Sequence, residues 1–281
     1  MDMTKLLGVD LSEYQRNISF ARLIADGATF VILRGGDGGY NDKCFDSFYN
    51  QAKEHNLPVG AYWFSRAVTV SQAEQEALQF YSTCLKDRKF ELPIYMDVEC
   101  RAQMNLSRAT LTEIVKVWTN TLKNLGYCVG IYSTANWIKN EMDYTAFEEV
   151  EFWIAQWSTR QPSLPHGMWQ FGGETNYLRD KKMAGYVVDQ NYMYKDYPSI
   201  IKSAGKNGYI KEDIDMTKEE LNKLIDERIE SILFGNGTEP SKWAEKELNE
   251  AIAKGITDGT CPKGYATREE VAAMVLRGTK I

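Results

Sequence analysis

Residues 92–99 read Leu-Pro-Ile-Tyr-Met-Asp-Val-Glu, a short apolar run that ends in two carboxylates, Asp97 and Glu99. Successive side chains of a β-strand point to opposite faces, so these two acids share one face while Val98 points away. Two neighbouring acids raise each other's pKa, so keeping both ionised costs free energy. The pair has two interpretations: a general acid with a charged partner, or a solvated strand end that caps the next element.

Seven further runs with strand character accompany this one in the first 200 residues. Together the eight runs cover residues 6–10, 29–34, 59–65, 92–99, 128–133, 151–157, 167–171 and 185–192. Segments with helical periodicity separate the early runs, namely residues 45–55, 71–85 and 107–125. Ser71 with Glu74 and Thr110 with Glu113 predict capping boxes for the last two of these helices.

Strands that alternate with helices predict right-handed crossovers and a parallel sheet. Eight such runs predict an α/β fold, a modified (β/α)8-type barrel. Residues 158–166 contain two prolines, and residues 172–184 have weak helical patterning. We therefore expect helices on the first five units and a degenerate last third.

The C-terminal parts of these runs carry acids, amides and aromatic residues. They are Asp10, Arg34, Tyr62, Trp63, Asp97, Glu99, Tyr132, Gln156, Gln170 and Asp189. In barrels of this kind the C-terminal ends of the strands build the active site. Aromatic walls with acids suit a sugar, whose ring faces stack while its hydroxyls take hydrogen bonds. Each residue alone keeps an alternative, since Arg34 also fits a structural ion pair and aromatic residues are common in cores.

Composition excludes several classes of function. A formal net charge of -6 without a basic patch argues against a nucleic-acid partner, and no apolar stretch approaches the ~20 residues that span a membrane. Two histidines and five scattered cysteines without CxxC spacing argue against a metal site, and we expect no cofactor. The first residues lack the pattern of a secretion signal, so we expect synthesis in the cytoplasm.

Seven motifs in order along residues 5–200 resemble the glycoside hydrolase family 25 lysozymes. They are Gly-Val-Asp-Leu-Ser (8–12), Val-Gly-Ala-Tyr-Trp-Phe (59–64), Tyr-Met-Asp-Val-Glu (95–99), Gly-Ile-Tyr-Ser (130–133), Phe-Trp-Ile-Ala-Gln-Trp (152–157), Met-Trp-Gln-Phe (168–171) and Val-Asp-Gln-Asn (188–191). The resemblance implies a modified β/α barrel that cleaves the β-1,4 bond between N-acetylmuramic acid and N-acetylglucosamine of peptidoglycan. One departure is visible, because Arg34 and the Gly-rich loop after it replace a segment that often reads Lys-Ala-Thr-Glu-Gly.

The resemblance also implies roles for individual residues. Glu99 stands at the position of the general acid and Asp97 at that of its partner, with Asp10 and Asp189 as supporting acids. The substrate groove is implied at Tyr62, Tyr132, Trp153, Trp169 and Gln170. Two strand residues advance ~6.6 Å, between the carboxylate spacings of retaining and inverting enzymes. We favour net retention assisted by the acetamido group of the substrate, as a hypothesis.

The sequence after the barrel predicts a second, small and mainly helical domain. We expect a barrel over residues 1–198, a linker over 199–215 and the helical domain over 216–281, beginning with a helix over 217–234. Gly-Ile-Thr-Asp-Gly (255–259) and Thr-Arg-Glu-Glu (267–270) resemble a single surface-layer-homology repeat, which implies wall binding. Trp243, Asp258 and Arg268 are its candidate binding residues, although Arg268 equally fits a salt bridge at a helix end. The apolar stripe of the first helix packs on its own domain or pairs with a second chain, which would make a homo-oligomer.

These expectations lead to one principal hypothesis and two alternatives. The principal one is a phage-type endolysin with muramidase activity, made in the host cytoplasm and acting on the wall after release. Its partners would be peptidoglycan and secondary wall polymers. The alternatives are a non-catalytic glycan-binding protein that keeps the barrel as a scaffold, and another barrel glycosidase such as a chitinase.

Overall fold

The computed structural model describes residues 5–173, 182–210, 240–260, 262–263 and 266–280, together with positions 222, 223, 225–227 and 229. The chain divides into two compact units, Met1–Glu212 and Asp213–Ile281. Each unit is described by itself.

The first unit is a closed barrel. Its strands are β1 (Leu6–Leu11), β2 (Val31–Asp37), β3 (Tyr40–Asn41), β4 (Val59–Phe64), β5 (Ile94–Asp97), β6 (Val129–Thr134), β7 (Glu151–Ala155), β8 (Met168–Gly172) and β9 (Asp189–Met193). They pair in the order β1-β9-β8-β7-β6-β5-β4-β2-β3, and a parallel β1–β2 pairing closes the ring. All eight predicted strands are present, and β3 adds only a short hairpin on β2. The predicted α/β barrel is confirmed.

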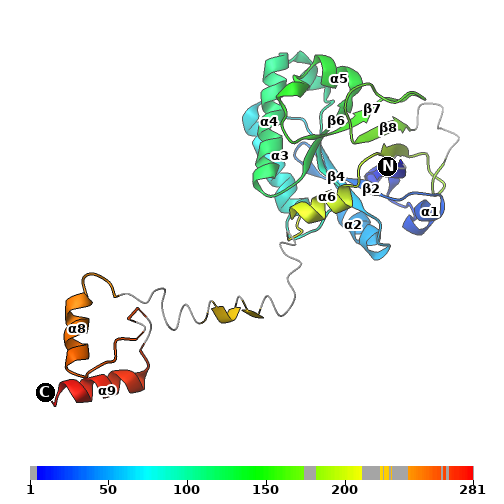
Figure 1. Ribbon diagram of the computed structural model, residues 1–281. Coiled ribbons are helices and arrows are strands. Elements are labelled where there is room, and N and C mark those ends of the chain that lie inside the picture. Colours follow the sequence, from blue (N-terminus) through cyan, green and yellow to red (C-terminus); the bar gives the residue numbers. More distant parts are fainter. Residues whose placement is uncertain are drawn as a thin grey trace. The chain divides into compact units, whose positions relative to one another are not determined.

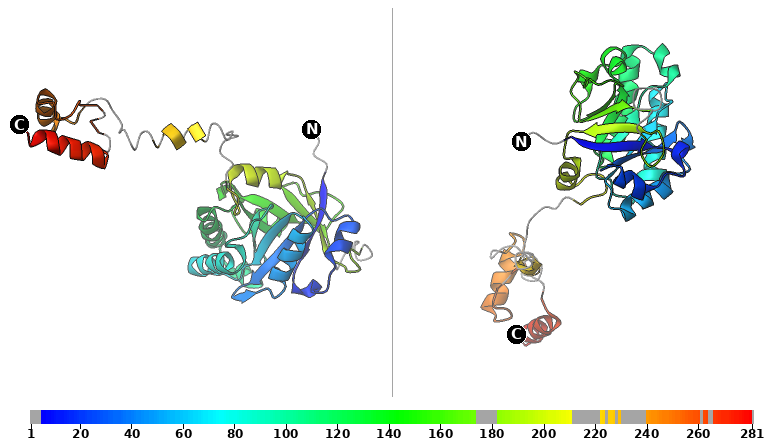
Figure 2. Two further views of the ribbon diagram at one scale, coloured as in Figure 1. Left: turned by 90° about the horizontal axis from the view of Figure 1, so that it is seen from below. Right: turned by 90° about the vertical axis from the view of Figure 1, so that its right-hand side faces the viewer.

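Five helices lie outside the strands (Figure 1, Figure 2). They are α1 (Phe20–Ala25), α2 (Phe45–Glu54), α3 (Val70–Phe80), α4 (Arg108–Asn124) and α5 (Ala135–Asn140). Shorter turns are η1 (Glu13–Gln15), η3 (Arg101–Asn105), η4 (Tyr144–Ala146) and the π-helical η2 (Tyr81–Leu85), which continues α3. The first five units thus carry a helix each, as predicted, and the described residues between β7 and β9 form none.

The prediction of a parallel sheet is wrong for the last strand. β9 runs antiparallel to both β1 and β8, with Asp189 opposite Asp10. A parallel return needs a crossover that carries the chain back along the barrel, and the described parts of the β8–β9 connection contain no helix to provide it. Asp189 therefore begins its strand, at the edge where the parallel strands end.

Both predicted helix caps are also wrong in position. α3 is capped by Thr69 with Gln72, and the hydroxyl of Ser107 accepts from the backbone N–H of Thr110 at the start of α4. Thr69 and Ser107 have extended backbones, as an N-cap requires. Ser71 and Thr110 already lie inside α3 and α4, so neither of them is an N-cap.

Aromatic rings fill the barrel below the site. The Trp153 ring lies 5.2 Å from that of Tyr95 and 4.3 Å from that of Tyr132, measured between centroids. A Cβ on Gly130 would lie 2.3 Å from the Tyr95 ring. Glycine is thus required there for Tyr95 to occupy the interior, and this packing forms the floor of the space above it.

The barrel unit extends beyond residue 198, where we predicted a linker. α6 (Tyr197–Ala204) buries Tyr197 and Ile201. After it, Asn207 is 0 % exposed, accepts from the backbone N–H of Cys128 at 2.7 Å and donates to the carbonyl of Leu92 at 2.8 Å. Residues 199–210 are therefore a docked end of the barrel, not a linker.

The second unit contains α8 (Glu245–Ala253) and α9 (Arg268–Gly278). Thr267 and Glu270 form a capping box at the start of α9. Most of the predicted helix over 217–234 lies outside the described residues, and the described positions within it are helical. In the part of the chain that the structure describes, no helix is both long and apolar enough to cross a membrane.

Candidate active site

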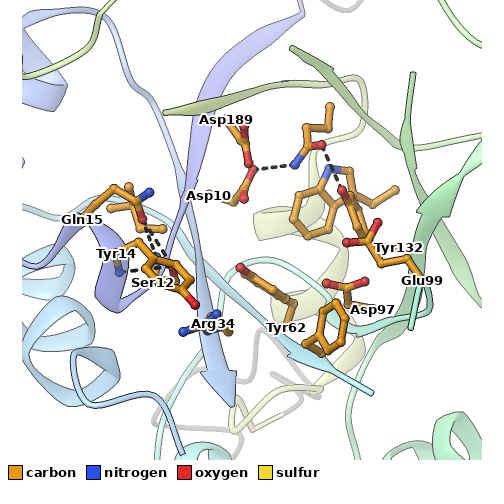
Figure 3. Close-up of a pocket in the computed structure, with 14 residues that line it drawn as sticks. Asp10, Ser12, Tyr14, Gln15, Arg34, Tyr62, Asp97, Glu99, Tyr132 and Asp189 are labelled. Carbon is orange, nitrogen blue, oxygen red and sulfur yellow. Dashed lines mark hydrogen bonds between the residues drawn. The ribbon is translucent and has the colours of Figure 1, made fainter. Parts of the chain in front are cut away.

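A cavity of about 340 Å³ opens at the C-terminal ends of the parallel strands. Its floor and walls come from β1, β2, β4, β5, β6, β7, β8 and β9 (Figure 3). The residues that line it are Asp10, Leu11, Ser12, Tyr14, Gln15, Arg34, Tyr62, Phe64, Asp97, Glu99, Tyr132, Trp153, Gln170 and Asp189. The structure thus brings together all four predicted acids with the candidate binding residues Arg34, Tyr62, Tyr132, Trp153 and Gln170.

Trp169 and Gln156 are the two groove predictions that fail. Trp169 precedes Gln170 on β8, so its side chain points to the opposite face, where it packs on Phe171 and Tyr192. Gln156 directly follows β7 and donates from Nε2 to the carbonyl of Arg160 at 2.8 Å. Alternation along β8 turns Trp169 away because Gln170 faces the cavity, and Gln156 likewise does not line it.

Two amide side chains hold Asp10, which is 8 % exposed. Its Oδ2 accepts from Nε2 of Gln170 at 3.0 Å and from Nδ2 of Asn191 at 2.8 Å. Burial raises the pKa of Asp10 from 3.8 to about 6, and the two amide hydrogen bonds oppose that rise. Asp10 is therefore fixed in position, with a pKa above that of an ordinary aspartate.

The amides are themselves oriented by ring donors. Oε1 of Gln170 accepts from the hydroxyl of Tyr132 and from the indole N–H of Trp157, both at 2.9 Å. Oδ1 of Asn191 accepts from the indole N–H of Trp153 at 2.8 Å. Each amide oxygen has a donor, so each nitrogen is turned toward Asp10.

Asp97 and Glu99 differ in their surroundings although they are two residues apart. Asp97 is 3 % exposed, and its Oδ1 has no hydrogen-bond partner among the described residues. Burial, followed by the charge of Glu99, raises the pKa of Asp97 well above its usual range. Glu99 reaches solvent at the mouth of the cavity, yet the surrounding protein and then the charge of Asp10 still raise its pKa. The pair is thus disposed to retain a proton that isolated carboxyls would lose.

Two tyrosines supply neutral hydroxyls beside these acids. Burial, followed by neighbouring carboxylates, raises the pKa of Tyr62 and of Tyr132 well above the usual value. The Tyr62 ring packs edge-on against that of Trp153, with 5.8 Å between centroids. Both hydroxyls therefore remain protonated, and the rings give the cavity an aromatic wall.

Arg34 forms the structural ion pair that was its alternative interpretation, and it also borders the cavity. Its Nε donates to Oδ2 of Asp42 at 2.8 Å, one terminal nitrogen donates to Oε1 of Glu13 at 3.3 Å, and the same guanidinium borders the cavity. Tyr14, which is 78 % exposed, places its ring centre 5.0 Å from the guanidinium carbon.

Asp189 approaches the backbone of Gly173. A Cβ at Gly173 would lie 1.6 Å from Oδ1 of Asp189 and 3.3 Å from the Trp157 ring. Only glycine leaves room for that carboxylate, so the end of β8 is shaped to receive the start of β9.

Sequence reasoning missed several residues of the site. Asn191 holds Asp10, Trp157 holds Gln170 at the rim, and Tyr14 extends the cavity beside Arg34. Strand alternation could have identified the first two, because residues an even number apart share a face. Asn191 lies two residues after Asp189, and Trp157 lies four residues after Trp153. Tyr14 lies in η1, where no strand periodicity identifies the inward face.

The predicted wall-binding residues lie in the second unit. Trp243 is 83 % exposed just before α8, and Arg268 is the first residue of α9. Asp258 accepts from the backbone N–H of Thr260 at 2.9 Å and from its hydroxyl at 2.8 Å. Their binding role stays a prediction. Among the described residues, no group of three or more metal-ligating side chains is placed to hold an ion.

Comparison with known proteins agrees with this geometry. The model of the family described as Glycosyl hydrolases family 25 matches residues 9–179. The chain belongs to glycosyl hydrolase family 25. The match begins within β1, includes β2 to β8 and ends before β9.

Curated relatives are distant and longer than the matched region. The chain is 24 % identical over 158 residues to the autolytic lysozyme of Clostridium acetobutylicum, a match that covers 56 % of this chain and 47 % of that protein. It is 26 % identical over 184 residues to lysozyme M1 of Streptomyces globisporus, covering 60 % of this chain and 62 % of the relative. The chain thus spans about half to three fifths of these relatives.

Solved structures of other proteins share the barrel fold of this chain. The bacterial lysozyme of Streptomyces coelicolor aligns with a TM-score of 0.61 at 22 % identity, covering 72 % of this chain and 98 % of that one. The CTP1L endolysin aligns with a TM-score of 0.60 at 21 % identity, covering 70 % of each chain.

Proposed function

We propose that the protein is a muramidase that hydrolyses the β-1,4 bond between N-acetylmuramic acid and N-acetylglucosamine of bacterial peptidoglycan. The observation that carries the proposal is the Asp97–Glu99 pair, one acid buried and one open to the cavity mouth, beside an aromatic wall. Family membership supports the reaction class, and the names of relatives, which include an N,O-diacetylmuramidase from Arthroderma benhamiae, support the substrate.

In the proposed mechanism Glu99 donates its proton to the leaving oxygen, because it is the acid of the pair that reaches the mouth of the cavity. Asp97 offers its unpartnered Oδ1 to the acetamido N–H of the substrate. That contact would stabilise the ionised form of Asp97 and leave the shared proton on Glu99. The oriented acetamido oxygen then attacks the anomeric carbon as the bond to the protonated leaving oxygen breaks. Water, whose proton returns to the Glu99 carboxylate, opens the intermediate with net retention of configuration.

Asp10 and Asp189 act as supporting acids. A glycosidase transition state develops positive charge at the sugar ring, and fixed carboxylates near that charge stabilise it. Asp10 is suited to this role because the amides of Gln170 and Asn191 hold its position. The ring faces of the aromatic wall would receive the sugar opposite these acids.

We further propose that the second unit binds the cell wall and that the protein acts as a phage-type endolysin after release from the cytoplasm. Two alternatives remain for comparison by experiment. A non-catalytic glycan-binding protein would bind wall without cleaving it, and a chitinase-like enzyme would cleave chitin oligomers as readily as peptidoglycan.

The test is to digest purified peptidoglycan, reduce the products with borohydride and identify the reduced ends by mass. The proposal predicts reduced muramic acid ends, together with little cleavage of a soluble chitin oligomer in parallel. Reduced glucosamine ends, or equal activity on chitin, would contradict it. Binding of the wall without any new ends would support the scaffold alternative.

A further inference from the structure

Arg34 is the one cationic side chain among the described residues that line the cavity, whereas four of the lining residues are acids. It extends from β2 next to Tyr62 of β4, and in Figure 3 it lies with Tyr14 on the side away from Glu99 and Tyr132. Its side chain is only 10 % exposed. A buried guanidinium requires fixed partners. The charges of those partners set the net charge that a ligand meets at this place.

Those partners, Glu13 and Asp42, offset the positive charge of Arg34 and fix the position of its guanidinium. Asp42, whose side chain is 1 % exposed, also accepts from the backbone N–H groups of Glu13 and Cys44 at 3.0 and 2.9 Å. Glu13 accepts from the hydroxyl of Tyr40 at 2.8 Å. The guanidinium therefore has its orientation fixed by two carboxylates that are themselves anchored in separate loops.

The charges around Arg34 select the kind of group that can bind to it. Two carboxylates beside one guanidinium leave a net negative charge, and those acids of the cavity that are ionised add to it. A ligand carboxylate would enter this field unfavourably, whereas a neutral carbonyl oxygen gains a charge-assisted hydrogen bond without that repulsion. Five N–H groups form the donor set of a guanidinium. Two of them serve the described carboxylate contacts, and the side chain of exposed Tyr14 is a further partner.

We propose that Arg34 is a specificity-determining residue that donates to a neutral amide carbonyl of the glycan substrate. The inference rests on the proposed muramidase function. Peptidoglycan offers this chemistry from two sources, the acetamido group of either sugar and the lactyl amide that joins muramic acid to the stem peptide. Removing the stem peptide turns the lactyl amide into a carboxylate and leaves the acetamido group unchanged, which separates the two sources.

The experiment measures kcat and KM on two soluble substrates: glycan strands that carry stem peptides, and the same strands after an amidase has removed the peptides. Arg34→Met is compared with wild type. Arg34→Lys is added because it keeps a positive charge beside buried Asp42, so that a folded variant is available even if Arg34→Met does not fold. Arg66→Met is the matched control, because Arg66 pairs with Asp37 on the exposed surface and does not line the cavity. Thermal unfolding of every variant confirms that each barrel is folded.

Loss of a hydrogen bond from a charged donor predicts that KM rises about tenfold in Arg34→Met while kcat changes little. Arg34→Lys keeps a cationic donor but loses the planar fork, so its KM should lie between those of wild type and Arg34→Met. If the lactyl amide is the acceptor, the rise occurs only on strands with stem peptides. If the acetamido group is the acceptor, KM rises equally on both substrates. Arg66→Met should behave as wild type.

Two results would overturn the inference while leaving the muramidase proposal intact. One is a wild-type KM for both Arg34 variants on both substrates. The other is a wild-type preference for peptide-free strands that disappears in Arg34→Met, since Arg34 would then bind a carboxylate. Failure of wild type to cleave either substrate would instead refute the proposed function.

Discussion

Asp10 is a buried acid that binds two amide groups and faces Asp189 across the β1–β9 pair. Because burial raises the folded-state pKa of Asp10 from 3.8 to about 6, the folded protein binds this proton more tightly than the unfolded chain. The stability that Asp10 contributes is therefore fully present below about pH 4 and is lost as the pH rises through about 6. Above that pH the ionised group lowers the free energy of unfolding by about 3 kcal/mol.

Asp10→Asn should make the protein more stable above neutrality, although it is expected to impair activity. Asparagine keeps an oxygen for Gln170 and Asn191 but carries no charge. We expect the free energy of unfolding to rise by about 2 to 3 kcal/mol at pH 8 and to change little at pH 4. Urea denaturation at both pH values measures it, with Asp46→Asn on the exposed face of α2 as the control. Equal stability of Asp10→Asn and wild type at pH 8 would contradict the assigned burial cost.

At the scale of elements, Asn207 connects the end of the barrel unit to two other segments, residues 90–92 and 126–128. Besides its side-chain bonds to Cys128 and Leu92, its backbone N–H donates to Gly126 and its carbonyl accepts from Phe90. Its φ of 56° lies in the left-handed region, which asparagine tolerates better than most residues. One residue thus satisfies backbone groups from the loops that precede β5 and β6.

Asn207→Ala should lower the free energy of unfolding by about 3 kcal/mol, because it leaves buried backbone groups unpaired and adds left-handed strain. Asn207→Gly removes the side-chain bonds but permits the backbone, so it should lose less. Asn120→Ala on the exposed face of α4 is the matched control. Chemical denaturation compares the four proteins. A loss no greater in Asn207→Ala than in the control would show that the segment does not depend on this residue.

The elements themselves were largely predictable, since apolar runs of strand length and intervening helical periodicity depend on local sequence. The direction of β9 was not, because it is set by the connection that precedes it and not by its own residues. Gln156 and Trp169 show the same limit at the site. Their residue types fit a sugar groove, but only the register of β7 and β8 shows that Trp153 and Gln170 face inward instead.

At the scale of the whole molecule, the first unit ends at Glu212, and this boundary predicts where the chain can be truncated. A chain that ends after residue 212 should fold with the thermal midpoint of the barrel in the full protein. A chain that ends after residue 196 should not fold, because it lacks the buried Tyr197 and Ile201 as well as Asn207. Circular dichroism on heating distinguishes the two. Cooperative folding of the shorter chain would show instead that the barrel ends near residue 198, as the sequence predicts.

The same truncation bears on the division of labour between the two units. A chain of residues 1–212 should keep the activity of the full protein on soluble glycan strands, since every described residue of the cavity lies within it. It should bind purified walls less strongly in a sedimentation assay if the second unit binds the wall. Unchanged wall binding would place recognition entirely in the barrel.

The most direct measurement of the central claim is the rate of cleavage of soluble peptidoglycan strands by Glu99→Gln. Glutamine keeps the size of the side chain but has no acidic proton to donate. General acid catalysis predicts a loss of kcat of at least about a hundredfold, whereas Glu54→Gln at the exposed end of α2 should retain the wild-type rate. A wild-type rate for a folded Glu99→Gln variant would show that another group protonates the leaving oxygen and would contradict the account.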